Sequence, residues 1–247
     1  MIEIKNLTKK YGKITAVDRL NLSVDRGEIF GFIGPNGAGK TTTISMMAGL
    51  LAPTSGSIKV CGIDMLLHPR LAKQKIGYIP DRPYIYEKLT AMEFLKFTAD
   101  MFKMDSRNFE TRAEAELIRF SLIDWADELI ESFSHGMKQR LIMCAALIHD
   151  PEVVVVDEPM VGLDPSAIRM VRLLLKELAA SGTTVFMSTH TLYIAQDLCD
   201  QIGVIHKGRL IARGTVEELK QRARVEKADL EQVFMILIEN GELRIES

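Results

Sequence analysis

The pattern of hydrophobic and polar positions divides the chain into two strand-rich parts and one helical part. Residues 1–33 show strand patterns: Leu20, Leu22 and Val24 alternate with polar residues, and an apolar run ends at Ile33. From about residue 84 to residue 150, apolar residues recur instead at the spacing of amphipathic helices. Strand patterns return at the four valines 153–156. The simplest interpretation is an α/β core that a helical insertion interrupts.

Turn and capping residues set the boundaries of the individual elements. Besides those of residues 1–33, we expect strands at 57–60, 153–156, 183–187, 202–205 and 209–213. Helices are expected over 41–51, between the start signal Asp164-Pro165 and the stop signal Gly182, from the capping box of Thr215 and Glu218, and from Leu230 to Gly241. In the insertion, the apolar stripes contain Phe94, Leu95, Met101 and Phe102, and then Leu117, Ile118 and Leu122.

Composition and charge restrict the class of protein. The 247 residues are 47% hydrophobic and 26% charged, which is typical of a globular chain. The net charge of -2 gives no global field that attracts nucleic acid or anionic lipid. Apolar runs such as 141–148 fall short of the roughly 20 residues that span a bilayer, and the first residues do not resemble a signal peptide. Cys61, Cys144 and Cys199 form no CxxC pair, so we expect reduced thiols in a soluble intracellular protein.

The segment GPNGAGKTT at 34–42 matches the phosphate-loop pattern G-x-x-x-x-G-K-[ST]. Glycines allow backbone N–H groups to converge on phosphate oxygens, and a following helix adds the positive end of its dipole. Lys40 can reach the β- and γ-phosphates, and the Thr41 hydroxyl is a ligand for Mg²⁺. The alternative is a glycine-rich turn without a ligand. The apolar strand before the loop and the helix after it favour nucleotide binding.

Acidic residues follow the next strongly apolar strand. Asp157 and Glu158 come directly after the four valines, and therefore at the carboxyl edge of a parallel sheet, where ligands gather. Asp157 would hold Mg²⁺ through water, and Glu158 would orient or deprotonate the attacking water. His190 ends a third strand and is a candidate γ-phosphate sensor. Without the phosphate loop, the acid pair would be more typical of a helix cap or turn, and the histidine of a surface position.

Together, these motifs resemble those of the ATP-binding-cassette (ABC) ATPases over nearly the whole chain. The phosphate loop, VVVVDEP, GLDP at 162–165 and STH at 188–190 stand in that family's order and spacing. The segment FSHGMKQR at 133–140 is similar to the family signature, LSGGQ followed by a basic helix. The resemblance implies an α/β fold with a P-loop NTPase (RecA-like) core, an N-terminal antiparallel β subdomain and an inserted α-helical subdomain. It also implies a head-to-tail dimer with ATP between one chain's phosphate loop and the other chain's signature.

The resemblance assigns roles to the residues that match the motifs. Tyr11 takes the position of the aromatic residue that stacks on adenine, although core or interface packing also suits a tyrosine there. Asp164 matches the loop that crosses the dimer axis. The implied catalytic residues are Glu158, His190 and Lys40, and the implied metal ligands are Thr41, Asp157 and Asp81. The residues implied to bind ATP are Tyr11, Gly34, Pro35, Asn36, Gly37, Ala38, Gly39, Lys40, Thr41, Thr42, Asp81, Ser134, Gly136 and Asp164.

Two motifs depart from the family pattern. Asp81 replaces the glutamine that normally ends the segment IGYIPD, so a shorter, charged side chain would face Mg²⁺ or the attacking water. The alternative is that Asp81 only caps a turn at 80–83. In the signature, His135 replaces a glycine and Met137 replaces the glutamine, whereas Ser134 and Gly136 are retained. The segments GMKQR and ADLEQVF resemble the branch that serves ABC-2-type exporters.

The implied organisation is a single ABC ATPase domain over residues 1–247. We expect the core and β subdomain at 1–83 and 151–218, the helical subdomain at 84–150 and a C-terminal helical extension at 219–247. The implied cofactors are ATP and Mg²⁺. The implied partners are a membrane permease on a separate chain and a second ABC ATPase chain, identical or closely related. The permease would hold the protein at the cytoplasmic face of the cell membrane, and no nucleic acid is expected.

Three functions compete. The leading hypothesis is an ATP-hydrolysing subunit that drives a permease, with export favoured by the branch resemblance. The alternative is a soluble ABC ATPase of translation, DNA repair or iron–sulfur assembly. Translation-type members resemble two cassettes in tandem and repair-type members carry long coiled coils, so iron–sulfur assembly is the version that stays open. A P-loop metabolic kinase is disfavoured by the signature segment at 133–140.

Overall fold

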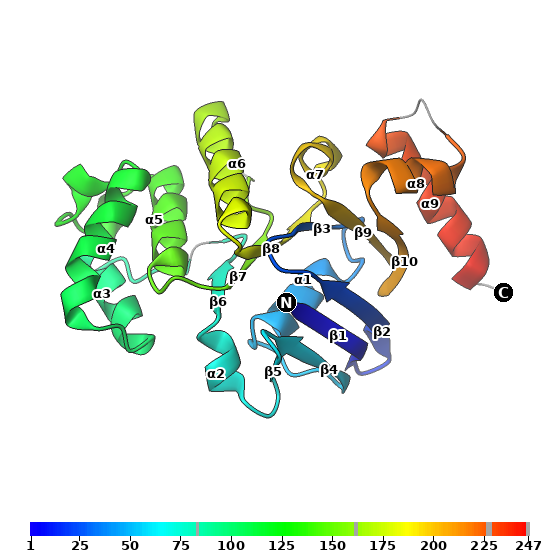
Figure 1. Ribbon diagram of the computed structural model, residues 1–247, viewed down its shortest axis with the longest axis horizontal. Coiled ribbons are helices and arrows are strands. Elements are labelled where there is room, and N and C mark those ends of the chain that lie inside the picture. Colours follow the sequence, from blue (N-terminus) through cyan, green and yellow to red (C-terminus); the bar gives the residue numbers. More distant parts are fainter. Residues whose placement is uncertain (83, 161–162, 226–228, 246–247) are drawn as a thin grey trace.

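The computed structural model describes residues 1–82, 84–160, 163–225 and 229–245, with the backbone alone for 240–245. A six-stranded sheet crosses the middle of the molecule. A smaller sheet and helix α1 lie on one side of it, and helices α5, α6 and α7 lie on the other (Figure 1). The predicted α/β class is confirmed.

The larger sheet combines parallel strands from distant parts of the sequence with one antiparallel edge strand. The strand order is β10-β9-β3-β8-β7-β6, with only β10 antiparallel to its neighbour. The bounds are Ile29–Ile33 (β3), Ile76–Ile79 (β6), Val153–Asp157 (β7), Thr184–Thr189 (β8), Gln201–His206 (β9) and Arg209–Gly214 (β10). Every residue of β3, β7 and β8 is buried, because both faces of the sheet are covered. The parallel strands end at one edge, so the loops after β3, β6, β7 and β8 meet there.

The smaller sheet is antiparallel and comes from the N-terminal part of the chain. Its order is β2-β1-β4-β5. The strands are Ile2–Tyr11 (β1), Ile14–Val24 (β2), Ser55–Val60 (β4) and Ile63–Asp64 (β5). Alternating burial along β1 and β2 directs one face toward α1 and the larger sheet. This is the antiparallel β part that the ABC resemblance implies.

Helices cover the larger sheet and extend beyond both of its ends. Their bounds are Lys40–Met47 (α1), Pro69–Lys73 (α2), Ala91–Met101 (α3), Ser106–Arg119 (α4), His135–Leu147 (α5), Pro165–Ala180 (α6), Leu192–Leu198 (α7), Val216–Ala223 (α8) and Leu230–Ile245 (α9). Two short 3-10 turns cover Ile123–Trp125 and Ile130–Ser132. Helices α3, α4 and α5 form a helical layer beyond β6, and α8 and α9 pack near β10 at the opposite end (Figure 1).

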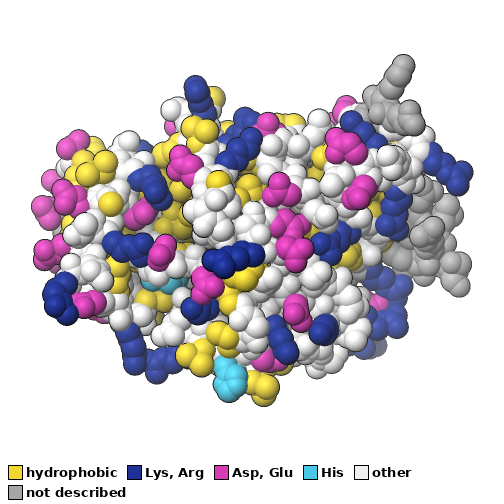
Figure 2. Space-filling view, viewed as in Figure 1, with side chains coloured by type: hydrophobic (Ala, Val, Ile, Leu, Met, Phe, Trp, Pro, Cys, Tyr) yellow, Lys and Arg dark blue, Asp and Glu magenta, His cyan; other side chains and the backbone are white. Residues whose placement is uncertain are grey.

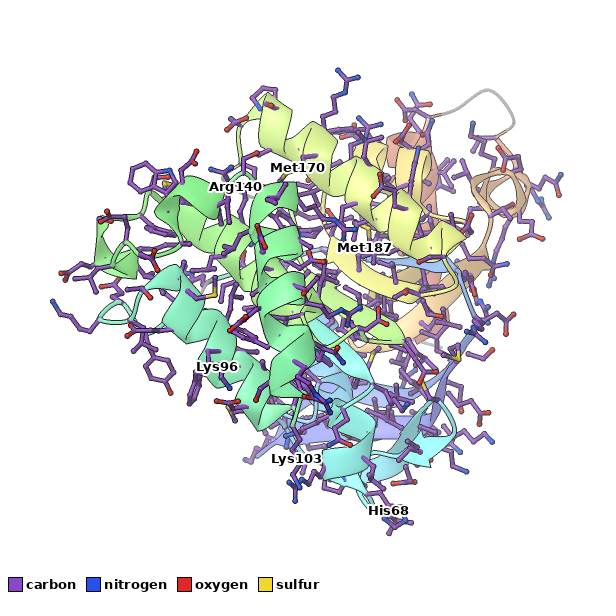
Figure 3. The ribbon with its side chains drawn as sticks, turned by 60° about the vertical axis from the view of Figure 1, so that its left-hand side comes forward. His68, Lys96, Lys103, Arg140, Met170 and Met187 are labelled. Carbon is purple, nitrogen blue, oxygen red and sulfur yellow. The ribbon has the colours of Figure 1, made fainter. Side chains whose placement is uncertain are left out.

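Apolar clusters pack against both faces of the larger sheet, and a third cluster joins β9 and β10 to α7, α8 and α9. Successive residues of a strand point to opposite faces, so Phe186 and Met187 of β8 belong to different clusters. Phe186 stacks on Phe30 of β3, with 5.5 Å between the ring centroids, on the side of the smaller sheet. Met187 packs on the other side with Val171 and Leu174 of α6, and it lies beneath that helix in Figure 3. This packing on both faces positions β3, β7 and β8, and with them the loops at their ends.

Several predicted boundaries were wrong. The helix expected over 41–51 runs from Lys40 to Met47, because Gly49 takes a positive φ of 66° and turns the chain. The last helix does not end at Gly241 but continues to Ile245. Met101 and Ile118 do not complete buried stripes, since they are 67% and 57% exposed. Helices α2 and α7 and strand β5 were not predicted, because each is too short to show a periodic pattern.

The surface carries charges of both signs. Figure 2 shows basic and acidic side chains interspersed over one face of the molecule, in line with the net charge of -2. Within the described parts of the chain, no helix combines the length and apolar sequence that crossing a membrane requires. The capping box predicted at Thr215 and Glu218 is present at the start of α8.

Candidate active site

A pocket lies at the edge of the larger sheet where the parallel strands end. Its volume is about 370 Å³, and it is lined by Ala16, Asn36, Gly37, Gly39, Lys40, Thr41, Thr42, Asp81, Glu158 and His190. The loops after β3, β6, β7 and β8 each contribute at least one of these residues. The structure therefore brings together the phosphate-loop segment, one residue of the acid pair, the histidine and Asp81, which are far apart in sequence.

The loop between β3 and α1 requires glycine at two positions. Gly39 has a φ of 107°, and a Cβ there would lie 2.4 Å from the carbonyl oxygen of Ala16. A Cβ at Gly34 would lie 2.4 Å from the carbonyl oxygen of Ile205. Glycine therefore lets the loop pass close to neighbouring backbone before α1 begins at Lys40. At the start of α1, as at any helix N-terminus, the first N–H groups have no partner within the helix, which suits an anion.

Three predicted ATP-binding residues of this loop do not line the pocket. Gly34 is enclosed by Ile205, and the carbonyl oxygen of Ala38 accepts a hydrogen bond of 2.9 Å from the Gly208 backbone N–H. The carbonyl oxygen of Pro35 faces the Lys40 ammonium. In this structure these three residues shape the loop.

The side chain of Lys40 is buried at the base of the loop. Its Nζ donates hydrogen bonds of 2.7 and 3.2 Å to the carbonyl oxygens of Gly34 and Pro35. Burial lowers the pKa of Lys40, and the nearby carboxylates of Glu158 and Asp157 act in the opposite direction. A buried ammonium whose hydrogen bonds go to neutral carbonyl oxygens is well placed to attract phosphate oxygens.

Asp157 is the more deeply buried member of the acid pair. It is 2% exposed and accepts a hydrogen bond from the Ser188 hydroxyl on the neighbouring strand. Burial raises the pKa of Asp157, and hydrogen bonds from Ser188 and Thr41 oppose that rise because they stabilise the carboxylate. Asp157 is thus linked to Thr41, the phosphate-loop residue at the start of α1.

Glu158 and His190 contact each other in the pocket. The Nδ1 atom of His190 lies 2.9 Å from one carboxylate oxygen of Glu158, and the His190 backbone N–H donates to the other at 3.3 Å. Glu158 has a φ of 51°, a left-handed conformation that is uncommon outside glycine, asparagine and aspartate. Strained backbone of this kind often marks functional residues, and here it accompanies a carboxylate directed at a candidate γ-phosphate sensor.

Asp81 and Tyr11 are both exposed, but only Asp81 lines the pocket. Asp81 follows β6 and is near enough to Asp157 to raise its pKa through like-charge repulsion. The Tyr11 ring ends β1, is 49% exposed and has the Lys9 ammonium 5.2 Å from its centroid. An exposed ring of this kind can stack on a base, although its contact with Lys9 is local to β1.

Ser134, Gly136 and Asp164 lie outside the lining of this pocket. Ser134 caps α5, with its hydroxyl accepting a hydrogen bond of 3.3 Å from the Met137 backbone N–H. A Cβ on Gly136 would meet nothing within 4 Å, so the start of α5 faces open space. Asp164 caps α6 and accepts hydrogen bonds from two backbone N–H groups. Gly162 of the same predicted motif lies outside the described residues.

The profile of the ABC transporter family matches residues 17–161, which is more than half of the chain. This chain belongs to the ABC transporter ATP-binding family. It is 39% identical over 241 residues to the probable multidrug ABC transporter ATP-binding protein YbhF of Escherichia coli K12, a match that covers 96% of this chain and 42% of YbhF. The chain thus spans less than half of that relative. It is also 41% identical over 222 residues to the linearmycin resistance ATP-binding protein LnrL of Bacillus subtilis, covering 90% of this chain and 71% of LnrL.

Solved ABC structures share the fold. One, described as the ATP binding subunit of an ABC transporter, has a TM-score of 0.91 and 33% identity and covers 96% of this chain and 99% of its own. Another is a dimeric ATP-binding cassette in a post-hydrolysis state bound to ADP and Pi, with a TM-score of 0.79 and 26% identity, covering 87% and 98%. The predicted ABC family and the predicted P-loop NTPase fold are therefore confirmed.

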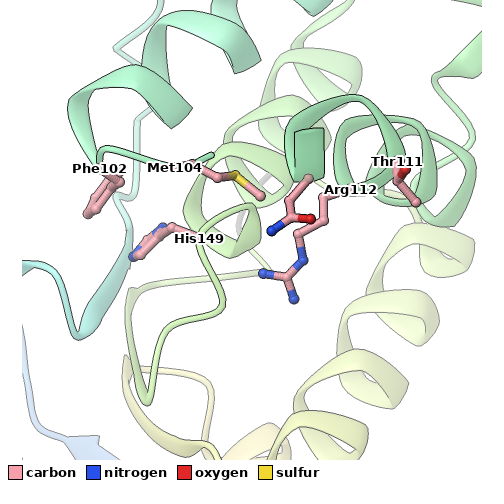
Figure 4. A pocket seen from close by; sticks show the side chains of 6 residues that line it. Phe102, Met104, Thr111, Arg112 and His149 are labelled. Carbon is pink, nitrogen blue, oxygen red and sulfur yellow. The ribbon is translucent and has the colours of Figure 1, made fainter. Parts of the chain in front are cut away.

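Two features of this ABC chain were not predicted from its sequence. Ala16 lines the nucleotide-side pocket through β2, and no sequence motif marks it. A second pocket of about 390 Å³ lies in the helical layer, lined by Phe102, Met104, Asn108, Thr111, Arg112 and His149 (Figure 4). There His149 stacks on Phe102, with ring centroids 3.6 Å apart, and burial lowers its pKa to about 4. None of the predicted site residues lies in this second pocket.

Proposed function

We propose that the chain is the ATP-binding and ATP-hydrolysing subunit of an ABC transporter and that it drives a separate membrane permease in the export direction. One observation carries this proposal: the phosphate loop, Glu158 and His190 line a single pocket, and Asp157 lies beside it. The similarity to YbhF and LnrL, whose names refer to multidrug transport and linearmycin resistance, supports the export direction.

The phosphate loop and the first turn of α1 would bind ATP. The backbone N–H groups of residues 34–42 and the Lys40 ammonium would hold the phosphates, and the exposed Tyr11 ring would stack on adenine. In this structure Lys40 donates to two loop carbonyl oxygens. Exchange of these neutral acceptors for anionic phosphate oxygens strengthens its hydrogen bonds, because charge-assisted pairs are the stronger ones.

The oxygen atoms beside this pocket also suit Mg²⁺. Thr41, Asp157 and Asp81 offer a hydroxyl and carboxylates, and no group of three or more His, Cys, Asp or Glu side chains gathers as a metal cage among the described residues. Mg²⁺ is typically held in this way, by one or two carboxylates together with substrate phosphates and water. We therefore assign Thr41 and Asp157 as the residues that hold it, with Asp81 nearby. When bound, the ion neutralises charge that develops on the phosphate oxygens.

Hydrolysis would use the contact between Glu158 and His190. Glu158 lines the same pocket as Lys40, so its carboxylate can orient a water toward the γ-phosphate and accept a proton from it. His190 holds both carboxylate oxygens of Glu158 through its ring and its backbone N–H. On ATP binding, the His190 ring would donate its N–H to the γ-phosphate in place of Glu158, so the position of Glu158 would respond to the γ-phosphate.

A second chain would complete the site. Ser134 and Gly136 lie outside their own chain's pocket, yet they open a helix that faces open space. In a head-to-tail dimer, this helix start would contact the γ-phosphate held by the partner chain. Asp164 would then lie near the dimer axis. ATP binding would close the dimer, and hydrolysis would reopen it.

The helical part at 84–150 would transmit this movement to the permease. Four apolar side chains at its start and along α3 are exposed: Tyr84, Tyr86, Phe97 and Met101. Tyr86 and Phe97 pack edge to face, with ring centroids 5.4 Å apart. The same segment begins three residues after Asp81, so a change at the nucleotide can reach this surface along a short path. The permease would hold the chain at the cytoplasmic face of the membrane.

The test is phosphate release by the purified chain, with and without Mg²⁺. We expect release that requires Mg²⁺ and is lost in Lys40→Ala, but is unchanged in Lys5→Ala, which alters an exposed lysine of β1. Purification from native membranes in mild detergent should then recover a hydrophobic permease. Co-purification with ribosomes or an iron–sulfur assembly complex instead would favour the soluble alternative.

A further inference from the structure

Ser188 connects β7 and β8 at the edge of the larger sheet that forms the active site. It is fully buried on β8, directly opposite Asp157 of β7 in the parallel ladder. Its hydroxyl donates a hydrogen bond to Oδ1 of Asp157. A carboxylate that is 2% exposed needs such donors, because burial without hydrogen bonds is strongly unfavourable for a charge.

The main chain of the same residue holds the other acid. The Ser188 carbonyl oxygen accepts a hydrogen bond of 3.2 Å from the Glu158 backbone N–H. Glu158 has a left-handed backbone conformation with φ of 51°, which must be held by its surroundings. The side chain and the main chain of Ser188 therefore fix Asp157 and Glu158, respectively.

We propose that Ser188 is a positioning residue for ATP hydrolysis: its hydroxyl holds the Asp157 carboxylate in the orientation that serves Mg²⁺. This inference rests on the proposed function. The Ser188 hydroxyl engages Oδ1 of Asp157, and Thr41 is a second hydrogen-bond donor to the same carboxyl group. Without the hydroxyl, one hydrogen bond no longer restrains rotation of the Asp157 carboxylate. Its contact with Thr41 and its orientation toward the Mg²⁺ site are then less fixed.

A matched pair of variants separates the hydroxyl from the packing. Ser188→Thr and Ser188→Val add side chains of the same shape, but only threonine keeps the donor. Thr184→Val is the control on the same strand. Thr184 is also fully buried, and its hydroxyl donates to the Asp25 carbonyl oxygen at 2.9 Å, at the opposite end of β8 from the pocket.

Two readouts are needed besides melting temperature: kcat and KM for ATP, and the ratio of ATP affinities in Mg²⁺ and in EDTA. We expect Ser188→Val to lose at least about tenfold in kcat/KM, as for loss of a charge-assisted hydrogen bond. Its Mg²⁺-to-EDTA affinity ratio should fall by about tenfold. Ser188→Thr should stay within about threefold of wild type on both readouts, and Thr184→Val should change neither, whatever it does to the melting temperature.

Equal losses in Ser188→Thr and Ser188→Val would overturn the proposal, because they would assign the effect to packing. Retention of both readouts in Ser188→Val would also overturn it. If the wild-type chain does not hydrolyse ATP, the proposed function fails on its own, while the affinity ratio still decides whether Ser188 supports Mg²⁺-dependent nucleotide binding.

Discussion

The phosphate loop depends on the absence of a side chain at Gly39, and Gly39→Ala tests this directly. The new Cβ would lie 2.4 Å from the Ala16 carbonyl oxygen, about 1 Å inside the 3.4 Å at which ordinary van der Waals contact begins. That oxygen belongs to the backbone of β2, so the loop must move instead. A displacement of about 1 Å near reacting groups costs on the order of 100-fold in rate.

The conformation of Gly39 adds a second cost, which a control can isolate. Alanine at a positive φ costs about 1–2 kcal/mol even where space is free. Gly62, in the turn between β4 and β5, has a φ of 75°, and a Cβ there would meet nothing within 4 Å. Gly62→Ala therefore carries only the conformational cost. Urea unfolding should show a loss of about 1 kcal/mol for Gly62→Ala and a larger loss for Gly39→Ala.

The assay is kcat/KM for ATP hydrolysis, measured on both variants at a temperature where each is folded. We expect kcat/KM to fall by about 100-fold in Gly39→Ala and to change less than about twofold in Gly62→Ala. A Gly39→Ala variant that keeps kcat/KM within about threefold of wild type would refute the reasoning, because the loop would then tolerate the shift.

Three further predictions concern other parts of the molecule. Ser134→Arg should retain ATP binding by the monomer and lose hydrolysis. Mixing it with Lys40→Ala chains should restore activity, because one of the two ATP sites in the mixed dimer carries neither change. An inactive mixture would argue against independent sites built from both chains. Asp81→Asn should change ATP affinity by less than about tenfold, or roughly 1.4 kcal/mol, while weakening permease-stimulated hydrolysis more strongly; a large loss of affinity, or full coupling, contradicts this. Because the pKa of His149 falls from 6.5 to about 4 on folding, its contribution is present above pH 6.5 and is lost as the pH falls toward 4. In urea titrations, the free energy of unfolding should fall by up to about 3 kcal/mol less between pH 6.5 and pH 4 in His149→Phe than in the wild type. An equal fall in both proteins would contradict a lowered pKa for His149.

The sequence predicted the parts of the fold that follow a strong local pattern. The four valines of β7 and the capping box of α8 appear where expected, because burial on both faces and backbone capping each leave a clear signature. Helix ends were harder to predict. The apolar sequence from Thr41 to Leu51 continues past the point where the positive φ of Gly49 turns the chain.

For the active site, the sequence predicted which residues take part and that they lie at the carboxyl edge of the larger sheet. It did not predict the contacts that these residues make between strands. The hydrogen bond from Ser188 to Asp157 depends on the register of β7 and β8, which are separated along the chain by α6. The approach of Ala16 to Gly39 likewise depends on how β2 packs against the loop. Such contacts come from tertiary packing, and a single sequence contains no periodic signal for them.

The account depends most on the role of Glu158, and Glu158→Gln tests it most directly. Glutamine keeps the size of the side chain but cannot accept the proton of water as a carboxylate does. ATP turnover and the oligomeric state in ATP should be measured on the same preparation, the latter by size-exclusion chromatography with light scattering. We predict retained ATP binding, a loss of hydrolysis of about 10²–10⁴-fold and accumulation of an ATP-bound dimer. Unchanged turnover, or hydrolysis lost together with ATP binding, would contradict the account.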